Sequence, residues 1–374
     1  MNILISPDKF KGSLTASQVC DAVEKGILEK MPSALITKIP LADGGEGSLD
    51  ALEKTLHFEK IDLKVNNPLF KPIDSFYGLS KDAAYIEMAS ASGLQLINES
   101  ERNPLFTSSV GTGEMISDAI KRGAKKIYLF VGGSATNDAG IGIASALGYI
   151  FLDENKQKLA PTGSNLKKIK SINQRSAVSF EGIEVNVLTD VKNPLHGKNG
   201  AAHVFAAQKG ASTSQIKELD SGLKNIAKVI QSTFGVNVSG LPGSGAAGGV
   251  GAGAVTFCNA KIQSGIESIL DLLHFDKMLQ AADWVITGEG LLDKQTLEGK
   301  VVKGVADRCE KAGKQVAIVC GDSKLSEADL VKLHTKYIKS IRTKNISKTI
   351  AMKNAAAFLT DRSQELIELI KLGK

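Results

Sequence analysis

The order of elements around residues 125–147 constrains the fold most. KKIYLFV (Lys125–Val131) predicts an apolar strand, GGSATND (132–138) a glycine-rich turn, and the apolar spacing after it a helix from about Ile141 to Leu147. Backbone N–H groups, hydroxyls and a carboxylate at such a turn suit phosphates and their metal. A tight turn whose glycines only supply positive φ angles is the alternative.

The same order of strand, turn and helix recurs at both ends of the chain, and it predicts a doubly wound parallel α/β sheet. Its expected third strand begins only at Trp284, far beyond the second, which ends at Ala42. The middle of the chain is therefore expected to be a large inserted mixed α/β domain. The predicted boundaries give residues 1–60 plus 278–374 to the parallel-sheet domain and 61–277 to the insert.

Length and charge limit the classes of protein that fit. A chain of 374 residues exceeds the size at which one core usually stops growing, so two domains are expected. Hydrophobic residues make up 43% and charged residues 23%, as in ordinary globular proteins. The net charge of +6 comes without a basic stripe, so no nucleic-acid partner is expected. A mild positive field suits a small anionic substrate, and a solvated basic face is the alternative.

The cysteines, histidines and apolar runs bear on compartment and metal. The four cysteines lie far apart without a CxxC pair and predict reduced core thiols. The N-terminus lacks a basic region followed by a long apolar run, and no segment has the apolar length of a membrane span. The histidines show no zinc-ligand spacing. We therefore expect a cytoplasmic protein without a membrane partner.

Charged or glycine-rich turns follow three strands of the predicted parallel sheet. DKFKGS contains Lys9, Lys11 and Ser13, ADGGEG contains Asp43 and Glu46, and TGEG contains Glu289. The carboxyl ends of parallel strands share one edge, where open α/β sheets bind ligands. The coincidence favours a ligand site over three solvated turns.

The insert offers a carboxylate and a guanidinium. Asp190 ends the apolar strand VNVLTD, where it can accept a hydroxyl proton or hold Mg²⁺ during phosphoryl transfer, although a turn or N-cap aspartate is the alternative. Arg102, close to the run TSSVGTGE, can bind a substrate carboxylate through two N–H groups. Plain helix capping explains the Thr and Glu of that run equally well.

The segment GSGAAG (243–248) matches the dinucleotide pattern GxGxxG, while GxxxxGK[ST] is absent. It follows a loop containing Pro242 rather than a buried strand, so it is weak evidence for a nicotinamide cofactor. The small residues predict a helix whose first amides, near Gly245, are open to an anion. Tight helix packing without a ligand is the alternative.

Several of these segments together resemble the bacterial class I glycerate kinase family. They are DKFKGS, PLADGGEGS, RNP with TSSVGTGE, GGSATNDAGIG, TDVKNPLHGKNGA, FAAQKGA, PGSGAAGGVGAG and TGEGLLDKQTLEGK, in family order along nearly the whole chain. The chain departs from the family at Leu291, where many relatives have arginine, and in FAAQKG, where FxPQKG is common.

The resemblance implies an enzyme that uses ATP and Mg²⁺ to phosphorylate D-glycerate, with a flavodoxin-like domain and an inserted domain whose cleft closes to exclude water. It places Lys9 and Lys11 with Asp190 in catalysis, and Asp190 as the group that activates the glycerate hydroxyl. The remaining expected roles are substrate binding by Ser13, Asp43, Glu46, Arg102 and Glu289; nucleotide binding by Gly132, Gly133, Ser134, Thr136, Asn137 and Gly245; and metal binding by Asp138, Asp190 and Asp293.

The product and the assembly state stay open at this point. The family likeness favours 2-phosphoglycerate over 3-phosphoglycerate, and both a monomer and a homodimer fit the sequence. A non-catalytic sensor of a small hydroxy acid and a nicotinamide-dependent oxidoreductase are the alternative functions.

Overall fold

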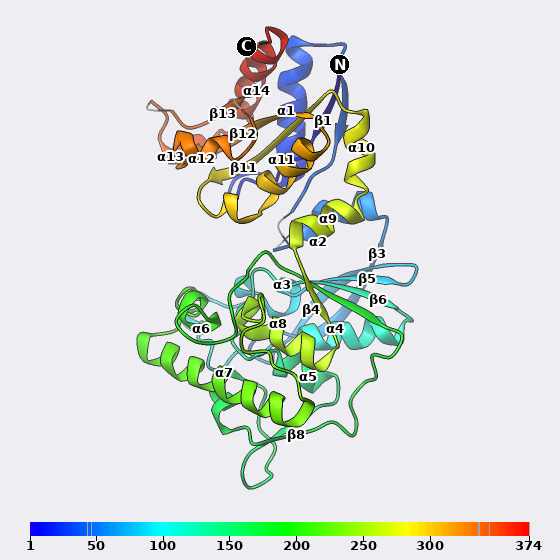
Figure 1. The fold of residues 1–374 in the computed structure, drawn as a ribbon, viewed down its shortest axis with the longest axis vertical. Coiled ribbons are helices and arrows are strands. Elements are labelled where there is room, and N and C mark those ends of the chain that lie inside the picture. The colour runs from blue at the N-terminus through cyan, green and yellow to red at the C-terminus, as the bar shows by residue number, and fades with distance from the viewer. Residues whose placement is uncertain (43, 46, 336, 344, 374) are drawn as a thin grey trace. The chain divides into compact units, whose positions relative to one another are not determined.

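A computed structural model of the chain describes residues 1–42, 44–45, 47–335, 337–343 and 345–373. The chain divides into two compact units: the first comprises Met1–Asp43, Asp50–Leu56 and Ile266–Lys374, and the second Gly44–Leu49 and His57–Gly265. Figure 1 follows the chain by colour, so that the first unit joins blue segments to yellow, orange and red ones. The boundary predicted near residue 278 lies inside α10 (Phe275–Ala281) of the first unit. That the units are separate folding domains stays a prediction.

The first unit contains a sheet of parallel strands in the order β13-β12-β11-β1-β2. Taken in chain order, this is the flavodoxin-like order 2-1-3-4-5, in which the chain leaves β1 on one side and returns on the other. The predicted doubly wound parallel sheet is confirmed. Its strands are β1 (Asn2–Ile5), β2 (Leu35–Lys38), β11 (Trp284–Leu292), β12 (Gln315–Ser323) and β13 (Ile338–Ser340).

Helices cover both faces of this sheet because successive strand residues point to opposite sides. Ala317 and Val319 of β12 pack with the helices α1 and α14, whereas Ile318 and Cys320 pack with Val302 of α11. The helices are α1 (Ala16–Lys30), α2 (Ser48–Leu56), α9 (Gly265–Leu272), α10 (Phe275–Ala281), η5 (Thr296–Glu298), α11 (Val301–Lys311), α12 (Glu327–Val331), α13 (Lys348–Lys353) and α14 (Ala355–Lys371).

The start of α1 shows how local sequence fixes this layer. Thr15 and Gln18 form a capping box: the Thr15 hydroxyl accepts the Gln18 N–H at 3.2 Å, and the Gln18 side chain accepts the Thr15 N–H at 2.9 Å. Val19, Val23 and Ile27 then lie fully buried on one face at helical spacing. α1 and α14 therefore pack side by side over the sheet (Figure 1).

The second unit contains a mixed sheet in the order β10-β9-β6-β5-β4-β3. Its first four strands are parallel, and β4 and β3 add antiparallel pairs. Glu87, Phe130, Leu188 and Gln263 stand in register at the carboxyl ends of the parallel strands. The strands are β3 (Glu59–Asn66), β4 (Pro72–Ser80), β5 (Ala83–Glu87), β6 (Lys126–Phe130), β9 (Glu184–Leu188) and β10 (Lys261–Gln263), with a separate pair β7 (Ile150–Leu152) and β8 (Ser171–Asn173).

Helices pack against this sheet around a continuous apolar core that includes Ile127, Leu129 and Val187 of its central strands. The expected mixed α/β architecture of this region is confirmed. The helices are α3 (Ala89–Ser92), η1 (Leu94–Leu96), η2 (Glu99–Glu101), α4 (Val110–Lys121), α5 (Ile141–Ala146), η3 (Gly163–Lys168), α6 (Ala201–Phe205), η4 (Ala207–Lys209), α7 (Thr213–Phe234) and α8 (Ala246–Phe257).

The structure bears on two predictions, one from the cysteines and one from the apolar segments. The four cysteines are unpaired and buried, which confirms their assignment to the core. Among the helices of the described chain, none combines the length and the apolar character needed to cross a bilayer.

Candidate functional site

In the first unit, the loop after β1 lies against the carboxyl end of β11. The Asp8 N–H donates to the Gly288 carbonyl at 2.8 Å, and a Cβ atom at Gly290 would lie 3.2 Å from Phe10 Cα. The chain reverses its order in the sheet between these two strands, which is the position where open α/β sheets bind ligands.

The predicted residues of the β1 loop differ in their surroundings. Lys9 is half-buried, its N–H donates to the Asp8 carboxylate at 2.7 Å, and Lys11 is exposed. The Ser13 hydroxyl donates to the Met352 carbonyl at 2.8 Å. Lys9 and Lys11 therefore belong to a turn that Asp8 and Ser13 help to hold.

The predicted carboxylates of the β11 end form a hydrogen-bonded turn. Glu289 is 8% exposed and accepts the Thr296 hydroxyl at 2.6 Å, and Thr296 in turn accepts the Asp293 N–H at 3.0 Å. The Asp293 carboxylate accepts the Gln295 N–H at 2.8 Å. Glu289 and Asp293 thus share one ordered turn at the edge of the sheet.

In the second unit, Asp190 lies just beyond the carboxyl end of β9. Its Oδ1 accepts the Ser264 hydroxyl at 2.8 Å and the Gly265 N–H at 2.9 Å, both from the chain that follows β10. The neighbouring strands β9 and β10 therefore fix the direction of this half-buried carboxylate. A fixed base at a strand end suits proton transfer from a hydroxyl.

Two glycine-rich segments meet at the same edge. The Gly132 N–H donates to the Gly44 carbonyl at 3.1 Å, and a Cβ atom at Gly132 would lie 2.5 Å from Gly45 Cα. Glu87, at the end of β5, accepts the N–H groups of Gly47 and Leu49. The predicted site residues Asp43 and Glu46 lie outside the described residues.

Glu87 is a residue that sequence reasoning missed. It is 6% exposed and ends the apolar strand AAYIE. A carboxylate at the end of a fully buried strand was the available signal, because a buried charge needs partners. Glu87 finds two of them at the start of α2.

Hydrogen bonds to Asp138 hold the GGSATND turn in place, which its sequence alone does not show. Asp138 is fully buried and accepts four hydrogen bonds, from the Ser109 N–H and hydroxyl at 2.8 Å and from the N–H groups of Gly140 at 3.1 Å and Gly142 at 3.3 Å. Burial raises the pKa of Asp138, and these donors oppose that shift. The amides at the start of α5, expected to face a phosphate, are therefore already used by a carboxylate of the protein.

Lys209 is the second residue that sequence reasoning missed. Its ammonium is buried beneath the turn and donates to the Ser134 hydroxyl at 2.9 Å and to the Thr136 carbonyl at 2.7 Å. Burial lowers the pKa of Lys209 to about 7, and the charge of Asp138 opposes this shift. Arg102 is close by, because Gly210 lies directly against the Arg102 backbone.

Gly245 stands at the start of α8. Its N–H donates to the Asn193 carbonyl at 3.0 Å, so this predicted anion donor already has a partner in the chain. Farther along, Ala247, Gly248 and Gly249 have positive φ angles, and a Cβ atom at Gly248 would lie 2.6 Å from Asn137 Cα. The small residues of α8 thus allow close packing on the GGSATND turn.

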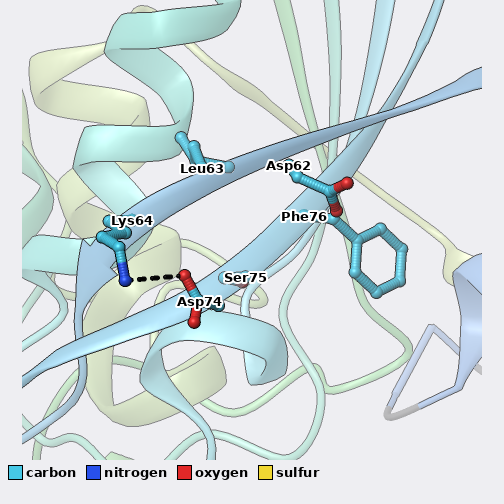
Figure 2. Close-up of a pocket in the computed structure, with 6 residues that line it drawn as sticks. All are labelled: Asp62, Leu63, Lys64, Asp74, Ser75 and Phe76. Atoms are coloured by element: carbon cyan, nitrogen blue, oxygen red, sulfur yellow. Dashed lines mark ion pairs between the residues drawn. The ribbon is translucent and has the colours of Figure 1, made fainter.

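Two other groups of charged side chains give less support for a functional site. Figure 2 shows a depression on β3 and β4 whose ion pair, Lys64–Asp74 at 3.0 Å, is largely exposed. His334, Asp307 and Glu310 of the first unit bring potential metal ligands within 4.8 Å of one another, a grouping that sequence spacing did not predict. The imidazole pairs with both carboxylates, at 3.2 and 2.9 Å, as in an ordinary surface salt-bridge network.

A family model described as the glycerate kinase family matches residues 3–371. The glycerate kinase of Halalkalibacterium halodurans is 43% identical over 85% of both chains, and the glycerate 2-kinase of Escherichia coli K12 is 41% identical over 86% of this chain and 85% of the relative.

A crystal structure assigned as glycerate kinase 2 from Salmonella typhimurium LT2 has a TM-score of 0.86 at 38% identity, covering 100% of this chain and 99% of the other. The family model and the solved structure both match nearly the whole chain. The chain belongs to the glycerate kinase family.

Proposed function

We propose that this protein, a phosphotransferase acting on an alcohol group, transfers the γ-phosphoryl group of ATP to the 2-hydroxyl of D-glycerate. Family membership and the name of the Escherichia coli relative, glycerate 2-kinase, support the reaction and the choice of hydroxyl. The observation that carries the proposal is Asp190, a carboxylate fixed by Ser264 and Gly265 at the end of a parallel strand.

Asp190 acts as the base in this proposal. Its carboxylate accepts the proton of the glycerate hydroxyl as that oxygen forms a bond to the γ-phosphorus. The bond from that phosphorus to the bridging oxygen breaks, and ADP leaves with the electron pair. Phosphoryl transfer needs mainly correct positioning of the reactants and neutralisation of their charge. One aligned carboxylate is therefore sufficient to activate the acceptor hydroxyl.

The cations and glycine-rich segments serve binding. Lys9 and Lys11 supply positive charge for substrate phosphates, and Glu289 orders the turn beside them. In the second unit, Gly132 and Gly133 present bare backbone to the ligand in this proposal. A side chain at Gly132 would collide with Gly45, so the two glycine-rich segments pack closely. Arg102 is the proposed partner of a substrate carboxylate.

Mg²⁺ is the proposed metal, and two of the predicted ligands fit it better than the third. Mg²⁺ prefers carboxylate oxygens together with several waters. Asp138 is fully buried with both oxygens directed at N–H and O–H donors, so its surroundings do not fit a hydrated ion. Asp190 and Asp293, half-buried at strand ends, do fit. Bound Mg²⁺ would neutralise phosphate charge.

The test is ³¹P NMR of the purified protein with ATP, Mg²⁺ and D-glycerate, with L-glycerate and no acceptor as controls. We expect a new phosphomonoester signal that is a doublet, because the 2-position carries one proton. A triplet would assign the product as 3-phosphoglycerate and overturn the choice of hydroxyl. No new signal from folded protein would overturn the proposed reaction.

A further inference from the structure

Lys209 is a buried ammonium without a carboxylate partner. The residue is 3% exposed, and two acceptors reach its Nζ, the Ser134 hydroxyl and the Thr136 carbonyl, both uncharged. Within the described chain, no carboxylate oxygen lies within 4.0 Å of this atom. An ammonium has three N–H donors, and burying its charge is costly unless an anion balances it. The protein alone leaves this charge without an opposite charge in contact.

The negative charge of Asp138 favours the ammonium of Lys209 but does not contact it. The carboxylate of Asp138 is occupied by Ser109, Gly140 and Gly142. Arg102, whose backbone lies against Gly210, adds a second cation, and its Nε atom is buried with no hydrogen-bond partner among the described residues. The backbone of this second basic residue therefore lies beside the segment that carries Lys209.

Unpaired polar atoms lie in the same turn. Thr136 Oγ1 and both amide atoms of Asn137 are buried without hydrogen-bond partners in the described part of the chain. Buried polar groups are nearly always hydrogen-bonded, so each exception calls for an explanation such as a missing ligand. In the described chain, the Asn137 side chain therefore has neither an acceptor for its NH₂ group nor a donor for its oxygen. A hydroxy acid supplies both, whereas an ionised phosphate supplies acceptors alone.

We propose that Lys209 binds an oxyanion of a substrate. This oxyanion supplies the negative charge that no group of the described chain in contact with the ammonium provides. The proposal rests on the proposed function and deepens it, since the oxyanion is the carboxylate of D-glycerate or a phosphate of ATP. The unpaired amide of Asn137 favours the hydroxy acid. Because Lys209 is closed off from solvent, binding includes a movement of the turn that covers it.

Isothermal titration of D-glycerate and, separately, of ATP into wild-type protein and the K209M variant tests this. Losing a hydrogen bond to a charged group costs about 1.5–3 kcal/mol, so the affinity for the bound oxyanion should fall about 10- to 100-fold. Loss with glycerate assigns its carboxylate, and loss with ATP assigns a phosphate. K217M, at an exposed lysine of α7, is the matched control and should bind as wild type. Unchanged affinity of folded K209M for both ligands overturns the proposal.

A thermal unfolding curve separates ligand binding from a structural role. Replacing an unbalanced buried charge by an apolar side chain of similar length is often neutral or stabilising. We therefore expect K209M to keep or exceed the wild-type Tm while it loses affinity. A lowered Tm with unchanged affinity would make Lys209 a structural residue and overturn the proposal.

A measurement on the wild type alone covers the case in which K209M does not fold. The charged groups identified near Lys209 are Asp138, whose charge favours the ammonium, and Arg102, whose backbone lies against Gly210. Lys209, with its pKa of about 7, is mostly neutral at pH 8 and must gain a proton to hold an oxyanion, whereas glycerate stays ionised. Titrations in two buffers of different ionisation enthalpy should show proton uptake on binding. No uptake would overturn the proposal.

These outcomes differ from those of the proposed reaction. Lys209-dependent binding without a new phosphomonoester signal would overturn the reaction and keep the oxyanion site. Full kinase activity with normal binding by K209M would overturn the site and keep the reaction.

Discussion

The carboxylate of Glu87 accepts the N–H of Gly47 at 2.9 Å, and so connects the end of β5 to the segment that precedes α2. A second bond, from the Leu49 N–H at 3.3 Å, strengthens the connection. This segment packs its Gly44 and Gly45 backbone on Gly132. Glu87 therefore positions one glycine-rich segment of the candidate site against the other.

Glu87→Gln should weaken this positioning without removing the side chain. The amide loses the negative charge that strengthens both bonds, and we expect the free energy of unfolding to fall by about 1–3 kcal/mol. Glycerate kinase turnover should fall with it, at unchanged secondary structure by circular dichroism. Glu99→Gln, at an exposed glutamate, is the control. Wild-type stability and turnover in Glu87→Gln would contradict the positioning role.

Asp190→Asn should remove the proposed base while keeping the shape of the site. Loss of a positioned general base lowers turnover by about 10²- to 10⁴-fold. Ser264→Ala, which removes one of the bonds that hold Asp190, should give a smaller loss. Steady-state kinetics with D-glycerate measures both, with the exposed Asp62→Asn as control. Near-normal turnover in Asp190→Asn would remove this residue from the mechanism.

Gly132→Ala should disrupt the meeting point of the glycine-rich segments. The added methyl group would lie 2.5 Å from Gly45 Cα and 3.0 Å from the Gly44 carbonyl oxygen, so backbone must shift. Overpacking of this kind costs about 1–3 kcal/mol, measurable by urea unfolding, and we expect kinase activity to fall as well. Gly240→Ala, where a Cβ atom meets nothing within 4 Å, should do neither. Equal behaviour of the two variants would argue against close packing at Gly132.

The contribution of Lys209 to stability should depend on pH. In the unfolded chain this lysine keeps its proton up to its ordinary pKa of 10.5, whereas in the folded protein it loses it near pH 7. Between these pH values the unfolded state binds more protons, so stability rises with pH. Without substrates, the stability of wild type relative to K209M should therefore be lowest at and below pH 7 and should rise toward pH 10. Denaturant unfolding at pH 6.5 and pH 9.5 measures the difference, and a constant one would contradict the lowered pKa.

The cysteines should resist thiol reagents in the native state. Cys20, Cys258, Cys309 and Cys320 are at most 1% exposed, and burial raises the pKa of each to about 12. Since the thiolate is the reactive form, labelling by a chromogenic disulfide should be slow until a denaturant is added. Four thiols should then react. Rapid labelling of the native protein would contradict their burial.

Much of the fold follows from local pattern. The apolar period and the turn chemistry place β6 and α5 close to their observed bounds, and the parallel order follows from the alternation of strands and helices. Asp190 was also identifiable as a candidate, because it is the carboxylate that ends the apolar run VNVLTD.

The rest depends on contacts between distant segments. Lys209 looks like one more surface lysine in FAAQKGA, and only the fold of the GGSATND turn shows that it is buried. Asp138 looks like a ligand for metal, yet Ser109 and the start of α5 take both of its oxygens. Sequence pattern gives residue types near a turn, but the turn's own hydrogen bonds decide which of them can face a ligand.

The pairing of β1 with β11 has a consequence for synthesis on the ribosome. Ile3 pairs with Trp284, so the strand made first must wait for one made after the second unit, 57–265, has emerged. Until then β1 has only β2 beside it, and its other edge presents unpaired backbone groups of the kind that recruit foreign strands. A nascent chain that stalls before Trp284 would keep this apolar edge open, so the first unit is exposed to pairing with foreign strands until β11 has been made.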